Sequence, residues 1–247
     1  MNITIIGSGG GGSWLITSFV KLFRNDPGVH IHIWDGDSLE EKNLDRQLFR
    51  DEYLGANKAE AICDMYGHGV ECELTPHDSY YVKGKPIPYD MGEYDWLFSC
   101  VDNHPGRADI LHLADQTGSH MVGGGNSYTD ADGWYYRRVW QNTACDPRVY
   151  FPEILEVLTG SPVQTEEGCT GEAQAETPQL ALANLWSVNH MSHLFWFHHK
   201  EAPLLSRDNR KFMPMLHKNS VFKQETLTVG MLERQQRQKY NKIKNGQ

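Results

Sequence analysis

A glycine run between a predicted strand and a predicted helix restricts this chain more than any other feature of its sequence. Residues 7–12 read GSGGGG, directly after the apolar segment 2–6 (NITII) and directly before an apolar-periodic segment at 13–23. Backbone N–H groups and the positive end of a helix favour an anion at such a junction. A flexible loop without a ligand is the alternative, but the strand–loop–helix context favours a phosphate-binding turn of a βαβ unit.

The residues of this unit have separate expected roles. Gly7 permits the tight turn, Gly9 lets the backbone approach a phosphate, and Gly12 lets the helix pack closely on the strand. Gly10 belongs to the same nucleotide-binding loop. Asp35 closes the second predicted strand, where a carboxylate can accept hydrogen bonds from ribose hydroxyls; a surface aspartate in a turn is its alternative. A nicotinamide or flavin enzyme would share all of these features.

Strand and helix signals alternate through the first half of the chain, which predicts a parallel sheet with helices on both faces. The predicted strands are 2–6, 30–34, 70–74, 95–100 and 120–122, and the predicted helices are 13–23, 58–66 and 105–117.

The second half is less regular. Its predicted segments are a long, antiparallel-type strand at 133–140, a crossing loop at 142–176, a helix at 178–199, short strands at 213–216 and 220–222, and a fraying polar tail from 233. We therefore expect an α/β fold, doubly wound and Rossmann-like, whose mostly parallel sheet carries a small antiparallel C-terminal extension. We expect one domain, 1–247, with a nucleotide-binding core at 1–125 and the extension at 126–247.

Residues 35–47 distinguish between nucleotide-binding families. They read DGDSLEEKNLDRQ, which resembles the D-x-D-x-V-x-x-x-N-L-x-R-Q signature of the ThiF, MoeB and ubiquitin-activating enzymes, with Leu39 in place of the usual valine. GSGGGG matches the family's GxGGxG form, GANKAEA its lysine after G-x-x-K, and CVDN its C-x-D-N. The resemblance covers residues 1–125 well and the remainder loosely.

This resemblance implies ATP-dependent adenylation of a carboxylate. In that reaction the carboxylate attacks the α-phosphate and pyrophosphate leaves, so negative charge builds up where fixed cations are needed. By resemblance, Arg46 and Lys58 supply two of these cations. Asp102 would hold magnesium, a hard ion that prefers oxygen ligands. The other implied nucleotide-binding residues are Asp35, Asp37, Asn43, Gln47 and Asn103.

Each of these residues also has a structural alternative. Arg46 could belong to a solvated ion pair with a neighbouring aspartate, and Lys58 could be an ordinary helix lysine. Asp102 and Asn103 could cap the helix that starts near residue 105. One ATP site explains all of these residues at once, so we favour it.

Three family features are missing from the sequence. The CxxC…CxxC zinc clamp is absent, so we expect ATP and magnesium but no structural zinc. The family's N-terminal helix, with its arginine, has no counterpart before the first strand, so a second arginine would come from elsewhere; Arg107, Arg137 and Arg138 are candidates without motif support. A separate catalytic-cysteine domain is also missing.

Three further groups of residues have open alternatives. Cys169 lies in the crossing loop, where some relatives accept the activated carboxylate on a cysteine; its glutamate neighbours would raise the thiol pKa, so a structural thiol is the alternative. His190 and His193 share a helix face, which fits a metal ligand pair or, preferably, packing. The aromatic residues of one segment fit strand packing or a groove for a peptide tail. They are Trp134, Tyr135, Tyr136 and Trp140.

Charge and composition limit the partners. The net charge of -9 disfavours broad nucleic-acid binding, which needs clustered Lys and Arg. No stretch approaches the roughly 20 apolar residues of a membrane span, no signal peptide is visible, and the scattered cysteines fit a reducing cytoplasm.

The resemblance also implies the partner. We expect a ubiquitin-like or sulfur-carrier protein with a C-terminal glycine, activated by a homodimer of this chain. Adenylation of a peptide and a non-catalytic, partner-binding scaffold of the same fold are the alternatives. A nicotinamide oxidoreductase is disfavoured by the N-L-x-R-Q segment.

Overall fold

A single eight-stranded sheet organises the molecule, in the order β3-β2-β1-β4-β5-β6-β7-β8. The computed structural model describes residues 1–126, 130–154, 181–220 and 223–244. The strands are β1 (Asn2–Ile6), β2 (His30–Trp34), β3 (Glu73–His77), β4 (Trp96–Ser99), β5 (His120–Asn126), β6 (Ala131–Tyr136), β7 (Pro214–Ser220) and β8 (Lys223–Thr228). Strands β1 to β5 pair in parallel, whereas β6, β7 and β8 continue the sheet antiparallel. The expected doubly wound, mostly parallel sheet with an antiparallel extension is confirmed.

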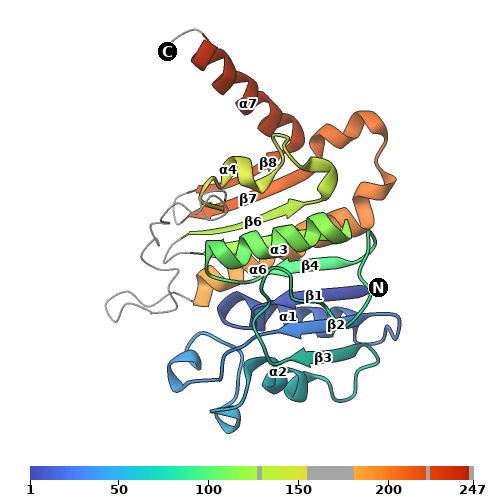
Figure 1. Cartoon of the computed structure of the whole chain (residues 1–247), viewed down its shortest axis with the longest axis vertical. Coiled ribbons are helices and arrows are strands. Elements are labelled where there is room, and N and C mark those ends of the chain that lie inside the picture. The colour runs from blue at the N-terminus through green and yellow to red at the C-terminus, as the bar shows by residue number, and fades with distance from the viewer. Residues whose placement is uncertain (127–129, 155–180, 221–222, 245–247) are drawn as a thin grey trace.

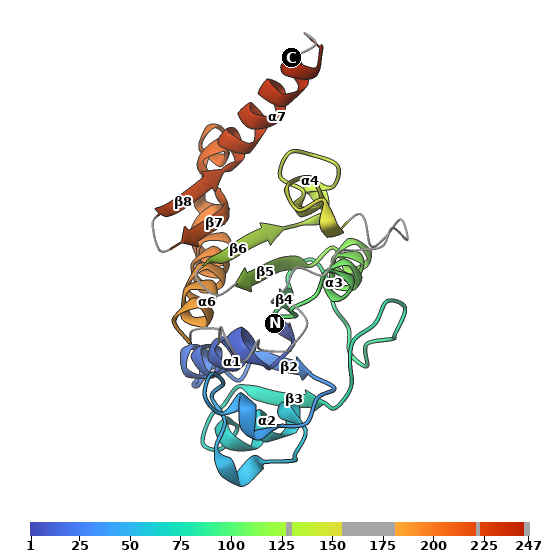
Figure 2. The ribbon, with the colours of Figure 1, turned by 90° about the vertical axis from the view of Figure 1, so that its left-hand side faces the viewer.

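The helices cover both faces of this sheet. They are α1 (Gly10–Phe23), α2 (Lys58–Tyr66), α3 (His104–Thr117), α4 (Pro147–Tyr150), α6 (Ala181–Trp196) and α7 (Val229–Lys244). Figures 1 and 2 show α3 on one face and α1 with α6 on the other, while α7 projects beyond the end of the sheet. A π-helical turn, Phe197–Glu201, continues α6.

Apolar side chains that repeat with helical spacing hold α1 and α6 together over the sheet. Phe19 of α1 lies 5.0 Å from Phe195 of α6 and 4.9 Å from Phe98 of β4, measured between ring centroids. Burial of such rings supplies most of the favourable free energy of a core. The Ser187 hydroxyl of α6 also donates to the Asp132 carbonyl of β6 (3.1 Å). α6 is therefore fixed against α1 and the middle of the sheet.

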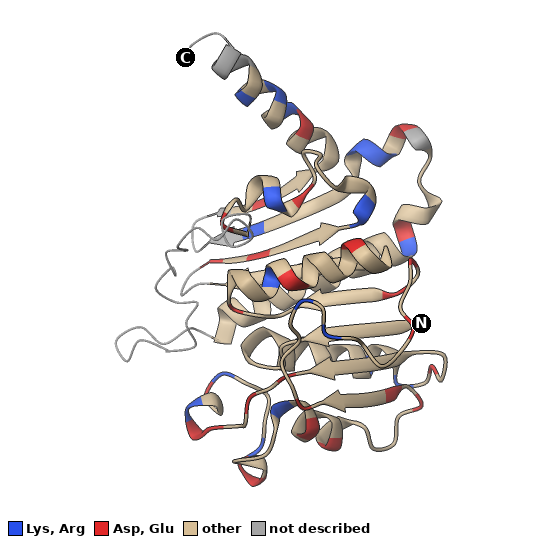
Figure 3. Cartoon of the chain, viewed as in Figure 1, with Lys and Arg blue, Asp and Glu red and all other residues tan. Residues whose placement is uncertain are grey.

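The central strands carry no charged residues. Figure 3 shows β1, β2 and β4 free of Lys, Arg, Asp and Glu, whereas loops and helices around them contain both signs. Because these strands are covered on both faces, charged side chains there would lack water. Charged groups that serve a site therefore come from the segments that follow the strands.

Several predicted boundaries in the sequence were wrong. The strand expected at 133–140 ends at Tyr136, because its antiparallel partner β5 is matched only as far as Met121, and a 3-10 turn follows at Arg138–Trp140. The strand expected at 70–74 lies at Glu73–His77; it is an edge strand, where Pro76 is tolerated.

The C-terminal segments also differ from the prediction. The short strands expected at 213–216 and 220–222 are the longer β7 and β8. The tail expected to fray from 233 continues as helix α7. The expected helix at 178–199 is α6 with its π-helical turn, and its first three residues lie outside the described ranges, as do residues 155–176 of the predicted crossing loop. Among the helices that the structure describes, none is long and apolar enough to cross a membrane.

Candidate functional site

The candidate site lies where β1 and β4 are neighbours at the centre of the sheet. The connection after β1 runs over one face and the connection after β4 runs over the other. In open α/β sheets, ligands bind outside the carboxyl ends of the strands at such a switch point. The glycine loop follows β1 here, and the CVDN segment follows β4. Both motifs therefore meet at the same edge.

The glycine loop makes the tight turn that the sequence predicts. Gly7 has φ +94°, a conformation that favours glycine. A Cβ atom at Gly12 would lie 2.0 Å from the Gly7 carbonyl oxygen, so only glycine lets α1 start this close to the turn. Gly9 is the N-cap of α1 and provides no side-chain cap. The N–H groups of the first turn have no intrahelical partner, so they are available to bind an anion.

Asp35 holds this loop in place. The backbone N–H and the hydroxyl of Ser8 both donate to Asp35 Oδ2, at 2.7 and 2.8 Å. Asp35 Oδ1 accepts from the Asp37 N–H (2.9 Å). The carboxylate is buried, so Asp35 is not the surface turn residue that the sequence allowed. Its ribose-binding role stays a prediction.

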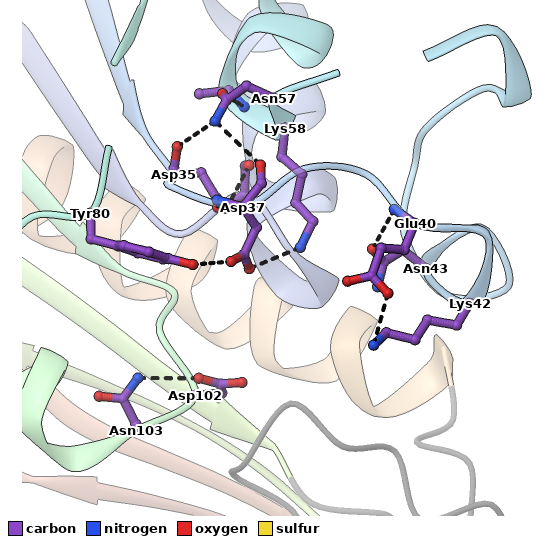
Figure 4. Close-up of polar contacts among 12 residues, drawn as sticks. Asp35, Asp37, Glu40, Lys42, Asn43, Asn57, Lys58, Tyr80, Asp102 and Asn103 are labelled. Carbon is purple, nitrogen blue, oxygen red and sulfur yellow. Dashed lines mark hydrogen bonds and ion pairs between the residues drawn. The ribbon is translucent and has the colours of Figure 1, made fainter. Parts of the chain in front are cut away.

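Asp37 is shared between a buried lysine and a tyrosine (Figure 4). Lys58 is buried and its Nζ donates to Asp37 Oδ2 at 3.1 Å. The Tyr80 hydroxyl donates to Asp37 Oδ1, and the Tyr80 ring covers Gly36, where a Cβ atom would lie 2.6 Å from the ring. Burial raises the pKa of Asp37, but the hydrogen bonds from Tyr80 and Lys58 outweigh it and hold that pKa below its usual value. The hydrogen bond to Asp37 raises the pKa of Tyr80 to about 12.

Asn57 supports the same segment from the start of α2. Its side-chain oxygen caps the helix by accepting from the Ala59 and Glu60 N–H groups. Its amide donates to the Asp35 carbonyl (2.9 Å) and the Asp37 carbonyl (3.2 Å). The cap thus fixes Lys58, the next residue, beside the loop that follows β2. Sequence reasoning missed Asn57 as well as Tyr80.

The N-L-x-R-Q segment is attached to the first turns of α1. The Ser13 hydroxyl accepts from the Leu48 N–H (3.1 Å), and the Trp14 indole donates to the Arg46 carbonyl (3.4 Å). Gln47 is buried, and its Nε2 lies 3.7 Å from the position of a Cβ atom on Gly9. Its Oε1 has no hydrogen-bond partner among the described residues. Arg46 and Gln47 therefore flank the glycine loop.

Asn43 has a structural contact in this segment. It is buried and accepts from the Glu40 N–H (3.1 Å), which closes a capping box over a 3-10 turn, Glu41–Asn43. Its predicted contact with a nucleotide stays a prediction.

In the CVDN segment, Asn103 caps a helix and the neighbouring Asp102 is exposed at the end of a strand. Asn103 caps α3, because its Oδ1 accepts from the Gly106 N–H at 2.7 Å. Its Nδ2 donates to Asp102 Oδ1 at 3.3 Å. The helix-cap alternative is therefore confirmed for Asn103, whose predicted contact with the nucleotide stays a prediction. Asp102 is exposed at the carboxyl end of β4, and its carboxylate is the hard oxygen donor that magnesium prefers.

Only one of the candidate second arginines lies at this edge. Arg107 of α3 has Nη2 3.0 Å from the position of a Cβ atom on Gly125, near the end of β5. Arg137 and Arg138 follow β6 at the opposite edge, and Arg137 lies 3.9 Å from Glu93. Arg137 and Arg138 therefore lie away from the glycine loop of the same chain.

The remaining candidates are the cysteines, the histidines of α6 and the aromatic residues of β6. Cys169 lies outside the described residues, and burial raises the pKa of Cys63, Cys100 and Cys145 to about 12.

The histidines of α6 pack against β7: His193 Nδ1 lies 2.9 Å from His217 Nε2 of that strand. In the described ranges no group of three or more His, Cys, Asp or Glu is arranged to hold a metal. The aromatic residues Trp134, Tyr135 and Tyr136 of β6 are buried, which favours strand packing, and Trp140 is half-buried. The groove for a peptide tail stays a prediction.

Comparisons with known proteins agree with this arrangement. A model of the ThiF family matches residues 1–172. The tRNA threonylcarbamoyladenosine dehydratase 2 of Saccharomyces cerevisiae is 25% identical over 126 residues, which are 49% of this chain and 27% of that protein.

Solved structures share the fold at low sequence identity. E. coli MccB with ATP has a TM-score of 0.60 at 14% identity, over 92% of this chain and 63% of that chain. MccB with AMPCPP and MccA has a TM-score of 0.61 at 14% identity with the same coverage. PaaA has a TM-score of 0.59 at 14% identity, over 92% of this chain and 64% of that chain. The chain thus spans about a quarter of the curated relative's length and less than two thirds of these solved chains.

Proposed function

The chain belongs to the ThiF family, and on that premise we propose that it catalyses ATP-dependent adenylation of a carboxylate. The acceptor we propose is the C-terminal carboxylate of a ubiquitin-like or sulfur-carrier protein. The observation that carries this proposal is the convergence of the glycine loop, the Arg46–Gln47 segment, Lys58 and Asp102 at one edge of the sheet. We also propose that 1–247 forms one domain, with a nucleotide-binding core at 1–125 and an extension at 126–247.

The residues at this edge fit a nucleoside triphosphate. Gln47 lies beside Gly9, where its Nε2 is 3.7 Å from the position of a Cβ atom, and its buried Oε1 lacks a donor within the described part of the chain. A ribose hydroxyl would supply that donor. The N–H groups of the first turn of α1 would hold phosphate oxygens. Asp102 would hold magnesium, which would offset the charge of the phosphates.

The proposed reaction exchanges one bond for another. An acceptor carboxylate oxygen forms a bond to the α-phosphorus, and the bond from that phosphorus to the oxygen of the leaving pyrophosphate breaks. Charge increases on the leaving oxygen, so cations fixed in advance lower the barrier. Arg46 and Lys58 would provide them. Lys58 would exchange part of its contact with Asp37 for a phosphate, and Tyr80 would hold Asp37 during that exchange.

Alternative readings have weaker support. A non-catalytic scaffold has no need for Arg46, Lys58 and Asp102 together. A peptide acceptor stays the second candidate, supported by the fold shared with MccB, which has been solved with AMPCPP and MccA. Exposed apolar side chains on α6 support the proposed homodimer; they are Leu182, Leu185 and Trp196.

Pyrophosphate exchange into ATP tests the proposed function. We expect exchange that depends on an added carrier protein with a free C-terminal glycine. The same carrier with one extra C-terminal residue is the matched control, because its terminal carboxylate is displaced from the reacting position. Peptides with free and amidated C-termini form a second arm, which tests the peptide acceptor. tRNA that carries threonylcarbamoyladenosine, whose threonyl group has a free carboxylate, forms a third arm, with unmodified tRNA as its control, because the yeast relative is named for that nucleoside. A wild-type protein that binds no ATP would support the scaffold instead.

Tyr80→Phe tests the exchange of Lys58 between Asp37 and a phosphate. Without the hydroxyl, Asp37 interacts more strongly with Lys58, and Lys58 is less available to ATP. We expect the Kd for ATP to rise about twofold to tenfold, the range for loss of one ordinary hydrogen bond, because the exposed Tyr80 acts on Lys58 only through Asp37. Tyr94→Phe is the matched control, because Tyr94 is 80% exposed. Equal Kd values for the two variants would exclude this role for Tyr80.

A further inference from the structure

Asn184 of α6 lies directly over the first turn of α1. Its side chain is 1% exposed. Its Oδ1 and Nδ2 atoms lie 2.8 and 3.0 Å from the position that a Cβ atom on Gly10 would occupy. Because Gly10 lacks a side chain, the Asn184 amide reaches the backbone at the start of α1. This asparagine belongs to no motif and lies outside residues 1–172, which the family model matches.

The Asn184 amide oxygen accepts a hydrogen bond, whereas its nitrogen has no hydrogen-bond partner in the described part of the chain. The Asn126 amide, at the end of β5, donates to Asn184 Oδ1 at 2.9 Å. In this arrangement the Asn184 oxygen is the acceptor, and Nδ2 is the remaining donor. Nδ2 has no hydrogen-bond partner within the described ranges. A buried N–H group without a partner costs free energy, and such groups are rare unless a ligand or water satisfies them.

The unsatisfied donor adjoins a second set of donors. The N-cap Gly9 gives α1 no side-chain cap, so the N–H groups of its first turn are available to an anion. An anion with several oxygens could accept from the backbone groups and from Asn184 Nδ2 together. A phosphate chain has such oxygens, and its charge also suits the helix N-terminus.

We propose that Asn184 is a phosphate-binding residue of the glycine-loop site, and that Asn126 is the positioning residue that orients its amide. This inference rests on the proposed function, since ATP supplies the phosphate chain. It extends the site beyond the motifs to a helix from the last third of the chain.

The test compares ATP with adenosine, which lacks phosphates. Titration calorimetry with the full chain is expected to show that Asn184→Ala weakens ATP binding about tenfold to a hundredfold, the range for one hydrogen bond to a charged group. Adenosine binding is expected to stay unchanged. Asn184→Asp keeps the shape but replaces the donor with a negative oxygen, so it is expected to lower ATP affinity further. Asn189→Ala, an exposed asparagine on the same helix, is the matched control.

Each outcome decides between specific explanations. A parallel loss of ATP and adenosine binding in Asn184→Ala would show a packing role and overturn the inference. Unchanged ATP affinity in both Asn184 variants would overturn it as well. Thermal unfolding of each variant establishes that it is folded. Binding is measured here instead of exchange. Wild-type protein that binds ATP but catalyses exchange with none of the acceptors named above would contradict the proposed function, and the inference would still be supported by its own titrations.

Discussion

Arg46→Ala is expected to lower the rate of acceptor-dependent pyrophosphate exchange by about 10²–10³-fold, the usual effect of removing one fixed group that stabilises charge in a transition state. Arg46 is half-buried and its carbonyl is anchored to α1 through the Trp14 indole. Its planar guanidinium can contact two phosphate oxygens at once. Because the charge on the leaving pyrophosphate develops only during the reaction, ATP binding should weaken far less than the exchange rate.

Arg50→Ala is the matched control for that variant. Arg50 lies in the same loop, is exposed, and forms a surface ion pair with Glu52 at 3.3 Å. Such pairs contribute little to stability, so this variant should keep the wild-type exchange rate. If both variants exchange pyrophosphate at the wild-type rate, Arg46 has no part in the chemistry and the proposed site is wrong. Arg46→Lys separates charge from geometry, since lysine keeps the charge but not the fork.

Gly12→Ala is expected to destabilise the fold more than any other substitution considered. The new Cβ atom would lie 2.0 Å from the Gly7 carbonyl oxygen, and because both atoms belong to the backbone framework, α1 must shift. Overpacking costs about 1–3 kcal/mol or more, while alanine returns up to about 1 kcal/mol of helix propensity. We expect a lower Tm by several degrees, since about 1 kcal/mol corresponds to roughly 2–4 °C for a chain of this size.

Gly11→Ala, one position earlier in α1, should have the opposite sign. Its Cβ atom would meet only the Val188 side chain, at 4.0 Å. Ordinary van der Waals contact and better helix propensity should leave Tm equal or higher. Thermal unfolding followed by circular dichroism measures both variants. Equal Tm values for the two would show that the α1 junction is looser than the structure indicates.

Local signals account for the part of the fold that the sequence predicted well. Gly7 and Gly12 mark a turn whose geometry few other residues allow, and Asn103 caps α3 as its position before the helix predicts. The polar tail from residue 233 was predicted wrongly. Its polar and basic composition predicted a fraying tail, but its Gln, Arg and Lys residues have high helix propensity, and the segment forms α7.

The missed parts of the site depend on contacts between distant segments. Tyr80 reaches Asp37 from the loop after β3, and Asn184 reaches Gly10 from α6. Neither tyrosine nor asparagine has a local pattern that reveals a partner so far along the chain. The end of β6 at Tyr136 likewise depends on where β5 begins, and not on the apolar residues that follow it.

The docking of α6 on α1 also has a consequence for how the protein is made. Asn184 and Val188 lie against Gly10 and Gly11, so the helix that covers the glycine loop comes from the last third of the chain. A ribosome adds about 5–20 residues per second, so the loop would leave the ribosome roughly 8 to 35 seconds before α6. During that interval the nascent loop lacks its cover. Nucleotide that binds the completed site therefore stabilises only the finished fold, and it would favour the last step of assembly over the earlier ones.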